Sequence, residues 1–221
     1  MIVFDVETTG LNPKKNSIVS IGAVEFENSG NQFYGECRPS PGAEISDEAL
    51  AVNGFTREQL NDPGRSLLSK TLESFIDWVY KCNERTLAGH NLAVFDFPFL
   101  KEAMRTYSIG KWPFGNRTVD SHALCYAHHI SKGMLMPVAM DKGGNSKHRS
   151  GITLDVALNY VGIPGEPKPH NALTGAKSAA EVISRLTKGE CLFPEYSQFK
   201  VPGYRGWDKI NRRLSRRGYA I

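Results

Sequence analysis

Residues 1–13, MIVFDVETTGLNP, form the stretch that decides the fold of this chain. Residues 2–6 are apolar apart from a single acid, a pattern that is typical of a buried β-strand. Side chains two positions apart in a strand share a face and lie roughly 6.6 Å from each other. Asp5 and Glu7 are therefore predicted to point to one side and Phe4 to the other. Two carboxylates placed in this way suit a divalent metal ion, and the alternative is a strand end that simply emerges into solvent.

The composition is that of an ordinary globular protein, with 40% hydrophobic and 23% charged residues among 221. This length allows one large domain or a domain with an appendage. The sequence has no apolar run long enough for a membrane span and no secretory leader pattern, so we expect a cytoplasmic enzyme without a membrane partner. The four cysteines are widely scattered, which argues against a disulfide framework or a structural zinc site.

Basic residues concentrate near the C-terminus, although the net charge is only +4. Between Arg205 and Arg217, six basic residues stand against a single acid. This segment is a candidate surface for phosphate, and a solvated tail without a partner is the alternative. We divide the chain into a domain of residues 1–190 and a basic extension of residues 191–221.

The remaining pattern predicts an α/β fold in which an antiparallel meander precedes alternating strands and helices. The meander is placed at residues 2–6, 18–26 and 33–37, with a turn at residues 28–31. The later strands are placed at residues 86–90 and 118–120, and the helices at residues 46–53, 68–79, 96–107, 122–130, 154–161 and 172–186. Residues 131–151 show no sustained period and are interpreted as a mobile excursion or an irregular hairpin. This order predicts a mixed sheet with helices on both faces.

Two further segments carry polar side chains at the ends of predicted elements. Asp96 begins a helix after the strand that ends near His90, where α/β folds gather their ligands; a helix-capping role is the alternative. His170 lies in a loop directly before the last helix. A histidine with a pKa of about 6.5 can accept a proton from water, and a plain surface histidine is the alternative. The combination of these residues with Asp5 and Glu7 is more informative than any one of them.

Three segments together resemble the exonuclease motifs of the DEDDh family: FDVETTG at residues 4–10, GHNLAVFDFPFL at residues 89–100, and His170 before Ala172-Leu173. The resemblance covers roughly the first 190 residues. The family comprises 3′-to-5′ exonucleases with a ribonuclease H-like fold, among them the proofreading epsilon subunit of bacterial DNA polymerase and ribonuclease T. It implies a metal-dependent enzyme that hydrolyses DNA or RNA from the 3′ end. A catalytically silent nucleic-acid-binding module on the same fold is the alternative.

The resemblance also implies a role for each acid. Asp5 would bridge two metal ions, Glu7 would bind the ion that carries the nucleophilic water, and Asp96 would hold the second ion. His170 would be the general base. Hard oxygen ligands favour Mg²⁺ or Mn²⁺ over zinc, and two such ions stabilise the attacking and leaving oxygens of phosphodiester hydrolysis.

Three residues are expected to contact the substrate. The resemblance assigns Thr8 and Thr9, which follow the first motif, to the terminal nucleotide at the 3′ end. Asn91 in the second motif is a further candidate. The sequence indicates no particular protein partner.

One position departs from the family pattern. The last acid of the family stands five residues after the histidine, and Gly175 occupies that position here. The explanations are an engineered inactive variant, a natural subfamily with a substitute ligand or water, and a degenerate nuclease that only binds. Glu181 lies on another side of the same predicted helix and is poorly placed to replace the acid. We therefore expect that a carboxylate restored at position 175 raises activity and tightens metal binding.

Overall fold

The computed structural model describes residues 1–203 except positions 111, 116 and 142. The basic segment between Arg205 and Arg217 lies outside the described residues, so its contact with phosphate stays a prediction. None of the helices in the described part has both the length and the apolar character needed to cross a membrane.

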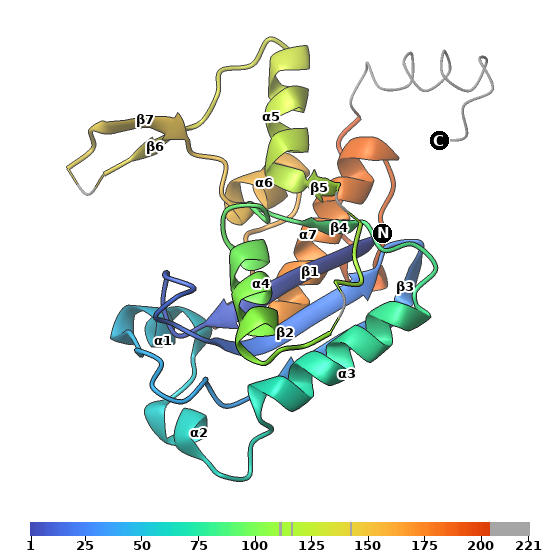
Figure 1. Cartoon of the computed structure of the whole chain (residues 1–221). Helices are drawn as coiled ribbons and strands as arrows, with labels where there is room; N and C mark the ends of the chain where they lie inside the picture. Colours follow the sequence, from blue (N-terminus) through green and yellow to red (C-terminus); the bar gives the residue numbers. More distant parts are fainter. Residues whose placement is uncertain (111, 116, 142, 204–221) are drawn as a thin grey trace.

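A five-stranded mixed sheet with the strand order β3-β2-β1-β4-β5 forms the centre of the protein (Figure 1). Its strands are β1 (Ile2–Thr8), β2 (Ile18–Glu25), β3 (Asn28–Glu36), β4 (Leu87–Gly89) and β5 (Thr118–Asp120). The first three strands pair antiparallel, whereas β4 pairs parallel with β1 and β5 pairs parallel with β4. The predicted mixed sheet is confirmed.

The turn of the meander differs from the prediction. Strand β3 already begins at Asn28, which pairs with Glu25, so the chain turns at residues 26–27 and not at residues 28–31. Strand β3 is an edge strand that alternates between exposed and partly buried residues. Polar residues can therefore continue the ladder of backbone hydrogen bonds there, and their turn-like composition is misleading.

Helices cover both faces of the sheet, as predicted. They are α1 (Asp47–Asn53), α2 (Arg57–Asn61), α3 (Leu68–Lys81), α4 (Asp96–Thr106), α5 (Ser121–Ser131), α6 (Leu154–Tyr160) and α7 (Ala172–Thr187), followed by a 3₁₀ turn, η1 (Pro194–Tyr196). Local signals explain several of their ends. Ser46 caps α1, Gly54 ends it with a φ of 75°, and Thr56 forms a capping box with Gln59 at the start of α2.

The alternation of β1 divides the core between the two faces. Ile2, Phe4 and Val6 pack with the buried side chains of α3 and α4, whereas Val3 packs with those of α7. Asp5 lies on the same side of the strand as Val3 and thus faces α7. The strand buries apolar side chains on one face and presents acids at its end on the other.

A glycine on β2 lets α7 approach this acidic side of the sheet very closely. Gly22 lies opposite Asp5 in the β1–β2 register. A Cβ atom at Gly22 would lie only 2.1 Å from the backbone nitrogen of Leu173 in the first turn of α7. The missing side chain therefore brings the start of α7 directly against the strands beside Asp5.

The segment after α7 also belongs to the packed part of the protein. Phe193 is 2% exposed, and the N–H groups of Leu192 and Phe193 donate to the Glu181 carboxylate. Glu181 also accepts from Arg185 at 2.7 Å. Glu181 is therefore committed to structure, in agreement with the prediction that it cannot replace a missing acid, and the packed chain extends past residue 190.

The irregular segment after α5 forms a hairpin, one of the two structures expected for it. Strands β6 (Val138–Met140) and β7 (Ser146–Ser150) pair with each other in a separate two-stranded sheet. The hairpin projects from the body of the protein (Figure 1). At its base the N–H of Gly151 donates to the carbonyl of Pro137 at 2.8 Å.

Candidate active site

The structure brings the predicted acids and the predicted histidine to one edge of the sheet. Asp5 and Glu7 come from the end of β1, and Asp96 is the first residue of α4. Asp96 is 2% exposed, and its Oδ1 accepts from the N–H of Val6 at 3.1 Å, which ties α4 to β1 between the other two acids. His170 lies just before α7, and its N–H donates to the carbonyl of Val52 at the end of α1.

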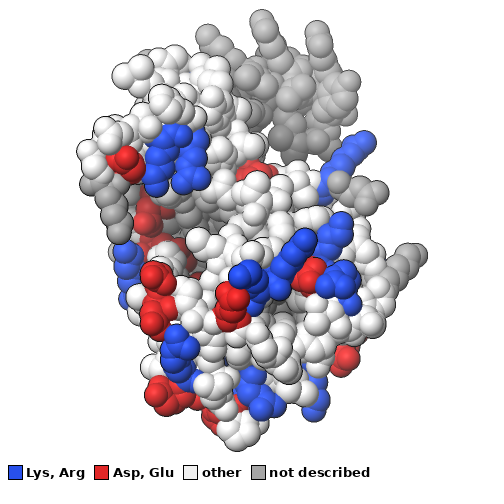
Figure 2. All heavy atoms as spheres, turned by 60° about the vertical axis from the view of Figure 1, so that its left-hand side comes forward, with Lys and Arg blue, Asp and Glu red and all other residues white. Residues whose placement is uncertain are grey.

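Two adjoining cavities open at this edge. One of about 570 Å³ is lined by Asp5, Glu7, Thr8 and His170. The other, of about 950 Å³, is lined by Asp5 and Asp96 at one end and by the β6–β7 hairpin at the other. Figure 2 shows a hollow on this face with acidic side chains inside it and basic side chains near its edge. Asp5 thus stands at the junction of a compact pocket and a longer groove.

Burial is the main cause that raises the pKa of each motif acid, and the charge of neighbouring carboxylates adds to it. The pKa of Asp5 lies well above its usual range because of burial, with further contributions from the charges of Asp96, Glu7 and Glu166. Burial raises the pKa of Glu7 to about 8, and the charges of Glu166 and Asp96 add to it. Burial also raises the pKa of Asp96 to about 7, although the hydrogen bond from Val6 opposes the shift. The ionised forms of these acids are therefore destabilised, and a bound cation would stabilise them.

The donor set fits a divalent cation that prefers oxygen ligands. Glu7 is only 8% exposed, and within the described residues no group donates a hydrogen bond to the carboxylate of Asp5 or Glu7. A buried carboxylate is stabilised by donors or by a cation, and donors are missing here. Across the described ranges, no three His, Cys, Asp or Glu side chains already stand as a closed ligand set. The fit therefore rests on the chemistry and burial of the carboxylates.

These pKa shifts predict how stability depends on pH when a chelator is present. The pKa values of Glu7 and Asp96 are raised on folding, so the unfolded chain loses these protons first as the pH rises. The free energy of unfolding should then fall between about pH 5 and pH 8, by on the order of 1 kcal/mol or more for each group. Urea unfolding at a series of pH values measures this. Glu7→Gln should flatten the decline, and identical slopes for the two proteins would show that the decline does not come from Glu7.

One acid of the site was not predicted from the sequence. Glu166 lies in the loop between α6 and α7, and its side chain is 6% exposed. It lines the compact pocket beside Glu7, whose pKa it raises more than any other charge does. No periodic pattern marks a loop residue. The available signal was an acid four residues before His170, together with a glycine where the family has its last acid.

The three expected substrate contacts fare differently. Thr8 lines the compact pocket, and Asn91 lines the groove, held there by the donation of its N–H to Asp120 at 3.0 Å. Thr9 is fully buried and lines neither cavity, because its hydroxyl donates to the Glu44 carbonyl and accepts from the Ser17 N–H. Its side chain thus stabilises the loop after β1, and the substrate contact expected of Thr9 stays a prediction.

A second histidine near the acids has a structural role. His90 lies within hydrogen-bonding distance of the Ser121 hydroxyl and of the Ile152 carbonyl, at 2.9 and 3.1 Å. Burial lowers its pKa to about 4. With both ring nitrogens engaged, His90 connects β4 to α5 and to the start of α6. Of these two histidines, His170 is the one whose ring has no hydrogen bond to the protein among the described residues.

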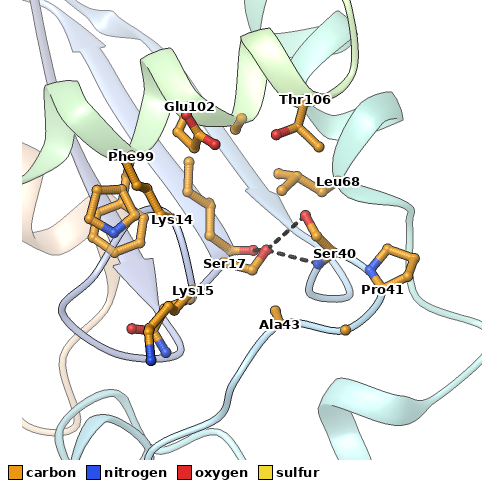
Figure 3. A pocket seen from close by; sticks show the side chains of 15 residues that line it. Lys14, Lys15, Ser17, Ser40, Pro41, Ala43, Leu68, Phe99, Glu102 and Thr106 are labelled. Atoms are coloured by element: carbon orange, nitrogen blue, oxygen red, sulfur yellow. Dashed lines mark hydrogen bonds between the residues drawn. The ribbon is translucent and has the colours of Figure 1, made fainter.

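A third cavity, of about 180 Å³, lies elsewhere and contains none of the candidate residues (Figure 3). It is enclosed by two loops, α3 and α4, and its loops are joined where the Ser40 N–H donates to the Ser17 hydroxyl at 2.8 Å. Its acid, Glu102, pairs with Arg105. Its other charged side chains are Lys14 and Lys15, so it lacks the converging acids of the other site.

Comparison with known proteins supports the same assignment. The family model described as Exonuclease matches residues 2–183. The chain is 28% identical over 191 residues to DNA polymerase III PolC-type of Thermotoga maritima, covering 85% of this chain but 12% of that protein. It is 32% identical over 139 residues to ribonuclease T of Escherichia coli K12, covering 56% of this chain and 63% of that enzyme. The chain thus spans less than two thirds of the length of these relatives.

A solved structure extends the comparison to the fold. The nuclease domain of 3′hExo, a DEDDh family member bound to rAMP, superposes with a TM-score of 0.63 at 16% identity. The superposition covers 91% of this chain and 94% of that one. The ribonuclease H-like fold expected from the motifs is confirmed. The chain belongs to the Exonuclease family, as its resemblance to the DEDDh exonucleases predicted.

Proposed function

We propose that this chain hydrolyses DNA or RNA from the 3′ end in a reaction that requires two divalent ions, Mg²⁺ or Mn²⁺. The observation that carries the proposal is the convergence of the half-buried Asp5 with the buried acids Glu7 and Asp96 at one edge of the sheet, with His170 in the lining of the compact pocket. No demand of core packing would place these groups together. The 3′ polarity is taken from the resemblance to the DEDDh exonucleases.

In the proposed reaction the acids bind the metal ions and the histidine accepts a proton. Asp5, Glu7 and Asp96 would hold the ions, which when bound stabilise charge on the attacking and leaving oxygens. His170 Nδ1 faces a Glu166 oxygen at 3.8 Å, so Nε2 is left to take the proton of the attacking water. The His170 side chain is 30% exposed, so it can exchange that proton with solvent.

The compact pocket suits a terminal nucleotide. Its volume of about 570 Å³ lies within the usual range for small-ligand sites. Apolar side chains of Leu11, Val52 and Phe95 line it together with Thr8. Leu11 and Val52 are 83% and 50% exposed, and a base placed between them would cover apolar surface that water otherwise contacts.

The test is hydrolysis of 5′-labelled single-stranded DNA and RNA with Mg²⁺, with Mn²⁺ and with EDTA. A ladder that shortens by one nucleotide at a time, and only with metal, is the expected result. Immediate release of the labelled 5′ nucleotide would exclude the 3′ polarity. Binding without any cleavage would favour the catalytically silent module.

The hairpin groove supports a nucleic-acid substrate. Lys147 and Arg149 of β7 line it, and it begins at Asp5 and Asp96. The exposed side chains of Val138 and Met140 add apolar surface for bases. We propose that phosphates upstream of the scissile bond lie along these two basic residues.

Replacing both Lys147 and Arg149 with Ala should therefore weaken binding and reduce its salt dependence. Each lost contact to a single strand should lower the slope of log affinity against log salt by about 0.7. Fluorescence anisotropy at several salt concentrations measures both quantities. The matched control, Lys70→Ala with Lys81→Ala, removes the same charge from exposed positions of α3. Equal slopes in the two double variants would exclude the groove as the path of the strand.

A further inference from the structure

Position 175 lies inside the acidic site, where a side chain would meet the carboxylates of neighbouring acids. A Cβ atom on Gly175 would lie 2.5 Å from Asp5 Oδ2 and 3.3 Å from Glu166 Oε1. The first distance is shorter than real Cβ contacts, so Asp5 would have to move. Gly175 is buried in the first turn of α7, which Gly22 allows to lie against the strands. The space that an acid at position 175 would use already contains the carboxylates of Asp5 and Glu166.

Glu166 reaches this space from a loop that is held at both ends. Its N–H donates to Asp155 Oδ1 on α6 at 2.7 Å. Four residues later, the N–H of His170 donates to the carbonyl of Val52 on α1. Gly165 and Pro167, the neighbours of Glu166, are exposed, whereas the Glu166 side chain turns inward and is 6% exposed. The loop therefore directs this one side chain into the site.

The surroundings of Glu166 offer its carboxylate little stabilisation. Within the part of the chain that the structure describes, the basic group nearest to its carboxylate is the His170 ring, whose Nδ1 lies 3.8 Å away, and no hydrogen bond reaches the carboxylate. Burial and the charge of Asp155 raise its pKa to about 7. A loop acid with free access to water would normally stay solvated. Its inward position beside Glu7 and Asp5 is explained if it shares their ligand.

We propose that Glu166 supplies the fourth carboxylate of the metal site, replacing from the loop the acid that the family carries at the position of Gly175. The inference rests on the proposed function. It explains both the glycine and the buried loop acid, because the missing side chain at Gly175 leaves the space that the Glu166 carboxylate occupies. It also reverses the expectation from sequence, since an acid added at Gly175 would displace Asp5 and Glu166 and would weaken the site.

The first experiment measures binding of Mn²⁺ to the full chain without nucleic acid, by calorimetry and by electron paramagnetic resonance. Glu166→Gln, which keeps the shape of the side chain, should weaken Mn²⁺ binding by about 10-fold or more, at least the cost of losing an outer-shell partner. Glu190→Gln, an exposed acid beyond α7, should leave it unchanged. Unchanged Mn²⁺ affinity in Glu166→Gln, with only a shifted pH profile of hydrolysis, would overturn the inference and assign Glu166 to the positioning of His170.

The second experiment moves the carboxylate. Gly175→Asp alone should bind Mn²⁺ more weakly than the unchanged chain, because the added side chain would crowd the carboxylates of both Asp5 and Glu166. In a background of Glu166→Ala, the same substitution should tighten binding and recover part of the hydrolysis, because the space left by the loop carboxylate allows the Asp5 carboxylate to shift beside the new acid. If the double variant binds Mn²⁺ no more tightly than Glu166→Ala does, the inference that the two positions supply the same ligand is overturned. If the natural chain neither binds Mn²⁺ nor hydrolyses nucleic acid, the proposed function itself fails.

Discussion

Replacing Asp5 with Asn should abolish hydrolysis and leave the chain folded. Asp5 lines both cavities, and the charges of Asp96, Glu7 and Glu166 all act on it. A ligand in this central place would serve both ions. We therefore expect a loss on the order of 10³-fold or more, above the roughly 10- to 100-fold cost of an outer-shell partner. Because one of several repelling charges disappears, the variant should also melt at a higher temperature than the natural chain in EDTA.

Single-turnover rates at saturating Mg²⁺ measure the effect. The control is Glu25→Gln, because Glu25 is a buried acid of the same sheet that lies outside both cavities and accepts from Asn83 and Asn31. This control should keep its activity even if it loses some stability. Full activity in Asp5→Asn would contradict the two-ion assignment.

His170→Ala should lower turnover by about 10²- to 10⁴-fold, the usual contribution of a general base, with Mn²⁺ affinity little changed. The histidine lines the compact pocket and is anchored through its backbone to α1, so removal of the ring should not release the loop. A loss of turnover without a loss of Mn²⁺ affinity distinguishes His170 from Glu166, whose replacement should weaken metal binding.

The pH profile of turnover and rescue by added imidazole check this prediction. A lost base should remove one limb of the profile, and imidazole should restore part of the rate to His170→Ala but none to Asp5→Asn. Equal turnover of His170→Ala and the natural chain would exclude His170 from the reaction.

Much of the fold follows from signals that are local in the chain. The alternation in β1 correctly separated Phe4 from Asp5 and Glu7, because a period of two leaves each side chain a single choice of face. Ser46 and Thr56 marked helix starts through bonds within their own turns. The prediction of a turn at residues 28–31 was wrong, because an edge strand tolerates polar residues that a central strand would exclude.

The site was predictable where its residues sit in motifs and not where their role depends on packing. Asp96 and His170 lie far apart in sequence, and only the family pattern connected them to Asp5. Thr9 matched the pattern, but its hydroxyl is already bound by the neighbouring loop. Glu166 escaped notice because its role depends on the volume left by Gly175, and that volume exists only once α7 has packed on the sheet.

The β6–β7 hairpin can change in evolution independently of the acids on the central sheet. Its two strands pair with each other and with no strand of the central sheet in the described chain, while its inner side borders the groove that leads to Asp5. Insertions, deletions or charge changes in the hairpin would leave the packing of the helices around the acids unchanged. Under the proposed function, substrate preference could therefore diverge between descendants of this protein while Asp5, Glu7 and Asp96 keep their places, and a designer could exchange the hairpin as a unit.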